Sequence, residues 1–154
     1  MRRINEIIYA GAFIRQEDKA NLFGLIPLNF KRDKDVQYPH VTSFFHTNIP
    51  LDAIQWILNH DGEDVTIQVD GISISNEVCA LRVQSVKALD GTIMPSTNRQ
   101  QHITLSTISE CQPVDANKIT SWRTIDTLNL KGYVRIIYKK SVSGDINKDK
   151  LPFK

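Results

Sequence analysis

The stretch His-Val-Thr-Ser at residues 40–43 recurs as His-Ile-Thr-Leu at residues 102–105, and this pair of tetrapeptides decides how the chain is interpreted. Each copy follows turn-forming residues and opens an apolar, β-prone run. Side chains two residues apart in a β-strand point to the same face of the sheet. Each copy therefore presents one imidazole and one hydroxyl side by side.

Two such strands laid together would gather four reactive side chains: His40, Thr42, His102 and Thr104. One imidazole can accept a proton while the other donates one, and the two hydroxyls can hold phosphate oxygens. The unperturbed pKa of imidazole is near 6.5, so neutral and charged rings coexist close to neutral pH. A lone His-x-Thr is usually an ordinary strand with a structural histidine, but the repeat favours acid–base cleavage of a phosphodiester.

Length and composition limit the classes of protein that this chain can represent. A chain of 154 residues is expected to form one domain with a real core. The net charge of +2, from scattered basic residues, argues against a dedicated nucleic-acid groove. Two cysteines make neither a disulfide framework nor a metal site, and Cys79 reads as a core residue. The absence of a signal-like or membrane-spanning segment predicts a cytoplasmic protein, in the host cytoplasm if the source is viral.

Hydrophobic periodicity and turn residues predict a mixture of strands and helices. The expected strands cover residues 4–14, 41–46, 65–69, 72–75, 78–86, 102–107 and 130–140, and the expected helices cover residues 17–23, 48–58 and 113–122. Residues 1–140 are expected to form a single two-lobed domain, followed by a polar tail at residues 141–154.

The order of these elements suggests an internal repeat. A His-x-Thr strand, a proline-opened helix carrying one tryptophan (Trp56 or Trp122) and further strands follow residue 40 and again residue 102. The expected fold class is therefore α+β, with two pseudo-symmetric lobes. Each lobe would have an antiparallel sheet and a flanking helix, and the two would enclose a central cleft.

With two His-x-Thr motifs in two α+β halves, the chain resembles the 2H phosphoesterase superfamily over roughly residues 4–140. Its compact length is most similar to the small phage nucleases that destroy cyclic oligonucleotide alarm signals, the anti-CBASS branch. The resemblance implies that His40 and His102 are the general acid and base and that Thr42 and Thr104 bind the scissile phosphate. It leaves open which histidine is the acid.

Other residues are candidates for substrate binding around this centre. Tyr9 could stack on a nucleobase, Arg99 in the polar loop before the second motif could screen phosphate charge, and Tyr133 lies on the last strand. By the same period of two, His46 shares the face of His40, although a surface position is the more usual role. No third ligand stands at a convincing spacing from the histidines, so neither a metal nor another cofactor is expected.

The leading hypothesis is a metal-independent phosphodiesterase acting on a small nucleotide, with cyclic oligonucleotide signals as the first choice of substrate. RNA ending in a 2′,3′-cyclic phosphate is the second choice. The alternative from another class is a non-catalytic module that binds nucleotides or RNA in the same cleft. The expected partners are thus a cyclic nucleotide or a short RNA, not a membrane, and the oligomeric state stays open.

Overall fold

The computed structural model describes residues 4–139. Residues 1–3 and 140–154 lie outside the described part, and with them lie Lys140 and the tail expected at residues 141–154. The division into one domain and a tail therefore stays a prediction.

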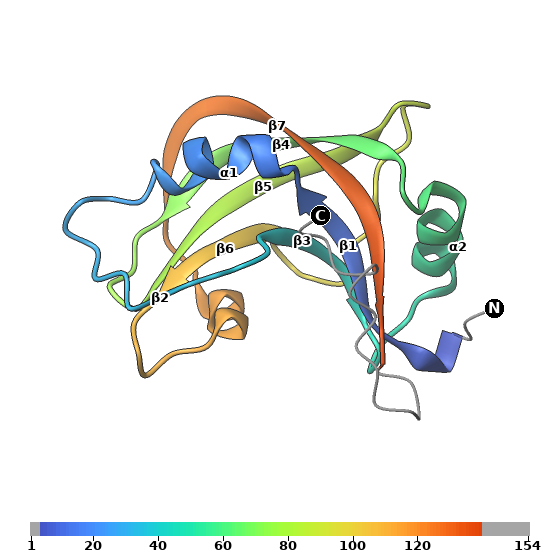
Figure 1. Ribbon diagram of the computed structural model, residues 1–154, viewed down its shortest axis with the longest axis horizontal. Helices are drawn as coiled ribbons and strands as arrows, with labels where there is room; N and C mark the ends of the chain where they lie inside the picture. The colour runs from blue at the N-terminus through green and yellow to red at the C-terminus, as the bar shows by residue number, and fades with distance from the viewer. Residues whose placement is uncertain (1–3, 140–154) are drawn as a thin grey trace.

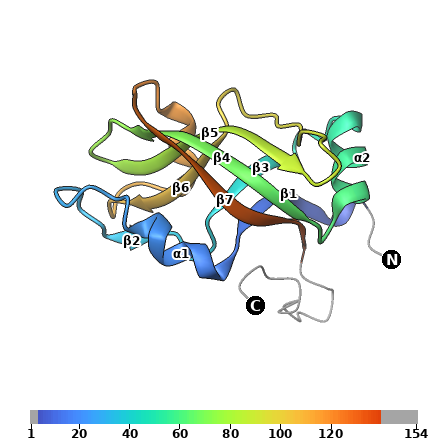
Figure 2. The ribbon, with the colours of Figure 1, turned by 90° about the horizontal axis from the view of Figure 1, so that it is seen from above.

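Strands dominate the described chain. The elements, in order, are the 3₁₀ helix η1 (Ile4–Glu6), β1 (Ile7–Ile14), α1 (Gln16–Phe23), β2 (Lys34–Asp35), β3 (His40–Phe45), α2 (Leu51–His60), β4 (Asp64–Ser73), β5 (Val78–Ala88), β6 (His102–Thr107), the 3₁₀ helix η2 (Pro113–Lys118) and β7 (Trp122–Tyr138). Figures 1 and 2 show α2 at one end of the sheet, away from α1. The α+β class and the mainly antiparallel pairing agree with the prediction.

All the strands belong to one sheet with the order β2-β6-β3-β1-β7-β4-β5, and β5 pairs again with β6. This last pairing, with Leu81 opposite Ile103, closes the strands from β6 round to β5 into a ring. The sheet arches, and the orange helix η2 lies beneath β6 in Figure 1. Because the sheet is continuous, the expected division into two lobes with separate sheets is not confirmed.

The main core lies on one side of the strands and is lined by alternating aliphatic residues. Val41 of β3 and Ile103 of β6 are fully buried in it, as is Ile67 of β4. Their immediate neighbours along each strand must point to the opposite face, because successive side chains alternate. The side chains of His40, Thr42, His102 and Thr104 therefore lie on the face away from the main core.

Helix α2 closes one end of this core, as its pattern predicts. Ala53, Ile54, Trp56, Ile57 and His60 are buried, which is the spacing of one helical face. Pro50 precedes the first turn, where its missing N–H leaves no helical hydrogen bond unmade.

The helix expected at residues 113–122 is wrong in extent. The structure has a 3₁₀ helix at residues 113–118, opened by Pro113 and by reciprocal hydrogen bonds between Gln112 and Asp115. The β-branched residues after Lys118 favour extended backbone. Trp122 consequently starts β7, opposite Ser73 of β4, instead of lying on a helix.

The segments expected at residues 65–69 and 72–75 join in one continuous strand, β4, which ends at Ser73 and whose register shifts around Val69 and Gly71; residues 74 and 75 lie outside it. Cys79 is buried, as predicted, and Cys111 is a second buried free thiol. None of the helices within residues 4–139 has the length and apolar character needed to cross a membrane.

Candidate active site

A cavity of about 270 Å³ opens on the outer face of β3 and β6. Both histidines and both threonines of the repeated motif line it, together with residues of β1, η2 and the loop before β6. The remaining lining residues are Tyr9, Val36, Phe45, Asn98, Pro113, Val114 and Asn117. Segments separated by sixty residues along the chain thus meet at one cavity, as the sequence pattern predicted.

The pairing of β3 with β6 explains how the motifs face each other. The strands are antiparallel, with Val41 opposite Ile103. One step along this register sets His40 across from Thr104 and Thr42 across from His102. Imidazole and hydroxyl therefore alternate around a local two-fold axis, and diagonal neighbours of this kind lie roughly 7–8 Å apart at Cα.

Both imidazoles are held in the same way. Nδ1 of His40 lies 2.9 Å from the carbonyl oxygen of Tyr38, and Nδ1 of His102 lies 2.9 Å from the carbonyl oxygen of Gln100. A carbonyl only accepts, so Nδ1 carries the proton in each ring. Neither Nε2 atom is hydrogen-bonded within residues 4–139, and in the neutral ring this atom has a free lone pair. The matching bonds thus orient two potential proton carriers.

The surroundings of the two histidines differ. The ring of His40 packs against those of Tyr9 and Phe13, with centroids 5.0 and 4.8 Å away. Burial lowers the pKa of His40, and repulsion from His102 adds to the effect. Burial also lowers the pKa of His102, which has no such aromatic neighbours among the described residues. His40 is therefore the ring whose surroundings most disfavour a positive charge.

The two threonines are buried at the base of the cavity, with exposed fractions of 7% for Thr42 and 9% for Thr104. The hydroxyl of Thr104 donates to the carbonyl oxygen of Pro113 at 3.2 Å, at the start of η2. The hydroxyl of Thr42 has no hydrogen bond to another residue in the described range. One hydroxyl is thus available as it stands, and the other must turn from Pro113 to meet a ligand.

The three predicted substrate-binding residues have different positions. Tyr9 lines the cavity, and burial raises the pKa of its hydroxyl to about 12. Arg99 is exposed and does not line the cavity. Tyr133 is set back on β7, where its ring lies 6.3 Å from that of Phe13 and beneath the guanidinium of Arg15. Tyr133 thus supports the aromatic layer behind His40 and does not line the cavity.

Sequence reasoning missed several cavity residues. Asn98 adjoins Arg99 in the polar loop before the second motif, so the prediction named the correct loop but the neighbouring residue. Val114 and Asn117 lie on η2, and the helix expected there gave no reason to place them at the motif. None of the lining residues is Asp, Glu, Lys or Arg. Within residues 4–139 no three His, Cys, Asp or Glu side chains are grouped closely enough to hold a metal ion.

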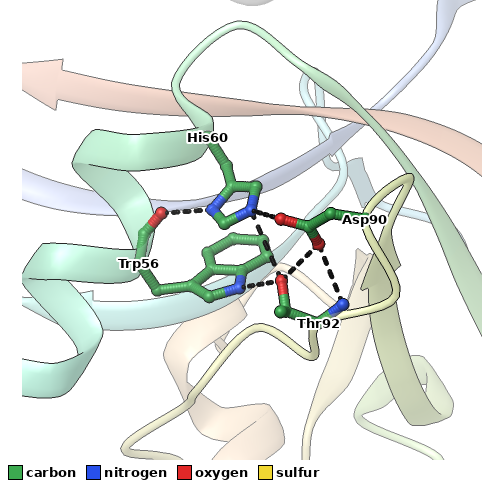
Figure 3. A network of polar contacts seen from close by, with 4 residues as sticks. All are labelled: Trp56, His60, Asp90 and Thr92. Carbon is green, nitrogen blue, oxygen red and sulfur yellow. Dashed lines mark hydrogen bonds and ion pairs between the residues drawn. The ribbon is translucent and has the colours of Figure 1, made fainter.

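A polar network of buried Trp56 and His60 with exposed Asp90 and Thr92 holds the beginning of the β5–β6 loop against α2 (Figure 3). Nδ1 of His60 lies 2.7 Å from the carbonyl oxygen of Trp56, and its Nε2 lies 2.8 Å from a carboxylate oxygen of Asp90. Both nitrogens face acceptors, an arrangement that favours the charged imidazolium of His60 over the neutral ring. Burial alone lowers the pKa of His60, but the bonds to Asp90 and Trp56 outweigh it and raise the pKa overall. Thr92 joins the network between Trp56 and Asp90.

Comparison with known proteins gives a likeness of fold. A crystal structure described as that of a fungal RNA kinase matches with a TM-score of 0.59 at 10% sequence identity. The match covers 90% of this chain and 46% of that one, so this chain spans about half of the larger protein. No protein-family model and no curated protein sequence matches the chain.

Proposed function

We propose that the chain is a phosphodiesterase of the 2H type that cleaves a small nucleotide phosphodiester by paired-histidine acid–base catalysis without a metal ion. The observation that carries the proposal is the matched pair of imidazoles. His40 and His102 line one cavity, and each is fixed through Nδ1 to the carbonyl oxygen two residues before it. A structural histidine has no reason to be repeated in the same setting across a two-fold axis with a threonine beside it.

His40 is assigned the role of general base because its surroundings favour the neutral ring, the form that can accept a proton. Its ring packs against the rings of Tyr9 and Phe13 and lies near a second imidazole, so its neutral form is favoured. His40 Nε2 takes a proton from the attacking water, and the water oxygen bonds to phosphorus. The bond from phosphorus to the leaving ribose oxygen breaks, and His102, which enters the reaction as the charged imidazolium, donates its Nε2 proton to that oxygen while Nδ1 keeps its bond to the Gln100 carbonyl oxygen. Solvent then returns each ring to its starting state.

The threonines act on the charge that develops at phosphorus. Thr42 donates its hydroxyl to one non-bridging oxygen, and Thr104 reaches another after releasing the Pro113 carbonyl. Donors aimed at developing charge are worth most in a site that excludes water. Both hydroxyls are almost wholly buried, so they meet this condition.

The cavity fits one phosphodiester with one nucleoside better than a polyanion. Its volume is about 270 Å³, and within residues 4–139 no Lys or Arg lines it to balance further phosphates. An RNA end bearing a 2′,3′-cyclic phosphate places one phosphate and one base at the site, so we favour this substrate. The likeness in fold to a fungal RNA kinase fits this choice. Cyclic oligonucleotides, with at least two phosphates, are the second candidate.

Turnover in EDTA tests the proposal. Purified protein is incubated with 2′,3′-cyclic nucleotides, with RNA ending in a 2′,3′-cyclic phosphate and with cyclic dinucleotides. We expect hydrolysis that EDTA does not reduce. His40→Ala and His102→Ala should each lower kcat by on the order of 10²–10⁴-fold. His46→Ala is the matched control, because this exposed histidine lies past the end of β3, outside the cavity.

Three results would contradict the proposal in different ways. Tight binding without turnover would identify a nucleotide-binding module. Loss of activity in EDTA would rule out a mechanism that needs no metal ion. Equal activity of wild type and both cavity-histidine variants would show that the imidazoles are structural.

A further inference from the structure

Two asparagines line the cavity and have no part in the proton transfers. Asn98 lies on the loop between β5 and β6, and Asn117 lies on η2. Neither side-chain amide is hydrogen-bonded to another residue of the described chain. Each amide offers both a donor and an acceptor. The cavity therefore contains two neutral amides whose donors and acceptors have no partner among the described residues.

The position of Asn98 is fixed relative to Thr42. The backbone N–H of Asn98 donates to the hydroxyl of Ser96 at 3.2 Å, and this hydroxyl donates to the carbonyl oxygen of Thr42 at 2.8 Å. The Thr97 N–H also bonds the Ser43 carbonyl oxygen at 2.8 Å. The loop is thus attached to the strand that carries the first motif.

Asn117 is tied in a comparable way to the second motif. Its helix begins at Pro113, whose carbonyl oxygen accepts the hydroxyl of Thr104. The reciprocal bonds between Gln112 and Asp115 fix the first turn. These bonds fix the first turn of η2 independently of the Thr104 hydroxyl, which in the proposed reaction turns from Pro113 to the phosphate.

The chemistry of the lining indicates what these amides bind. Tyr9, Phe45 and Val114 supply aromatic and aliphatic surface, and among the described residues no lining side chain carries a fixed charge. A planar, neutral group with donors and acceptors along its edge complements this surface. A nucleobase is such a group, and an asparagine amide pairs with adjacent donor and acceptor atoms on its edge.

We infer that Asn98 and Asn117 recognise the edge of the nucleobase attached to the scissile phosphate and so set the base preference of the site. The inference rests on the proposed function in one respect, namely that the ligand is a nucleotide. It assigns no catalytic role to either amide. Their removal should change which base is preferred, and not the chemical step.

Calorimetric binding of the four nucleoside 3′-monophosphates and of inorganic phosphate tests this without requiring turnover. Wild type should prefer one base by about tenfold or more. Asn98→Ala and Asn117→Ala should each lower the affinity for the preferred nucleotide by about three- to tenfold, the effect expected from the loss of one neutral hydrogen bond. Binding of inorganic phosphate should change less than about twofold. Lys118→Ala is the control, since this exposed side chain adjoins Asn117 but does not line the cavity.

Equal affinity of wild type for all four bases would overturn the inference. A base preference that persists in both asparagine variants would also overturn it. An equal loss of binding affinity for all four nucleotides and for inorganic phosphate would do the same. The kinetic counterpart uses 2′,3′-cyclic nucleotides, for which each variant should change the ratio of kcat/KM values between bases. If wild type binds one base preferentially but hydrolyses no substrate, and the asparagine variants lose that preference, the proposed reaction is refuted and the role of the asparagines is supported.

Discussion

Gly11 controls how closely β1 approaches the first motif. It lies at an irregularity of the β1–β3 pairing, opposite Thr42. A Cβ atom on Gly11 would lie 2.0 Å from the carbonyl oxygen of Val41, and 3.0 and 3.1 Å from the carbonyl carbon of Val41 and the Cα of Thr42. All three are backbone atoms of β3, so no change of rotamer can relieve the overlap. Gly11→Ala must move the strand.

The size of the effect follows from this overlap. Since Cβ contacts below 3.0 Å are essentially never found, β3 must move by roughly 1 Å, and His40 and Thr42 flank the residue that moves. Overpacking of this kind costs about 1–3 kcal/mol of unfolding free energy. A misplacement of about 1 Å in catalytic groups costs on the order of 10²-fold in rate. We expect both losses in Gly11→Ala.

Chemical denaturation measures the first loss, and kcat/KM for a 2′,3′-cyclic nucleotide measures the second. Gly24→Ala is the matched control, because its closest contact would be 3.3 Å from the carbonyl oxygen of Asn21 at the end of α1. Stability within 0.5 kcal/mol of wild type, roughly the scatter of harmless surface substitutions, would refute the reasoning about Gly11. Lost stability with full activity would show that the strand shift does not reach the site.

Two further predictions concern pH. Burial lowers the pKa of both His40 and His102 below the usual value near 6.5. The plot of kcat/KM against pH should therefore be bell-shaped with its maximum below pH 6.5. A maximum above pH 7 would contradict paired-imidazole catalysis. The raised pKa of His60 means that its stabilising effect is complete below its unfolded pKa and is lost as pH rises through the folded pKa. His60→Gln should therefore cost about 1 kcal/mol of unfolding free energy near pH 6 and progressively less toward pH 9, and a pH-independent cost would contradict a charged His60.

Much of the fold was predictable where the signal is local. The spacing of apolar residues placed α2 within three residues of its observed bounds, and alternation placed β3 and β6. The pairing of β5 with β6 that closes the sheet was not predictable, because the hydrophobic periodicity of a strand does not indicate which other strand it pairs with. For the same reason Trp122 was placed on a helix, although its long-range pairing with Ser73 makes it part of β7.

The candidate site shows the same division. A period of two predicts that His46 shares the face of His40. The β1–β3 register shifts by one residue between Ala10 and Gly11, so the residues of β3 beyond Thr42 point to the opposite face from the one that the period predicts. Phe45 lines the cavity instead, and His46 is exposed beyond the strand. A bulge depends on how two strands meet, so counting along one of them cannot reveal it.

The amino-acid sequence alone determined that a histidine and a threonine share a face in each of two strands, because the two-residue period is a property of extended backbone. Only the tertiary structure decided that the two faces meet at one cavity, that Tyr9 and Phe13 pack against His40, and that Asn98 and Asn117 join them. These relations depend on strand pairing and loop anchoring between residues far apart in the chain. The free energy of those contacts comes from packing and hydrogen bonds that no local pattern encodes.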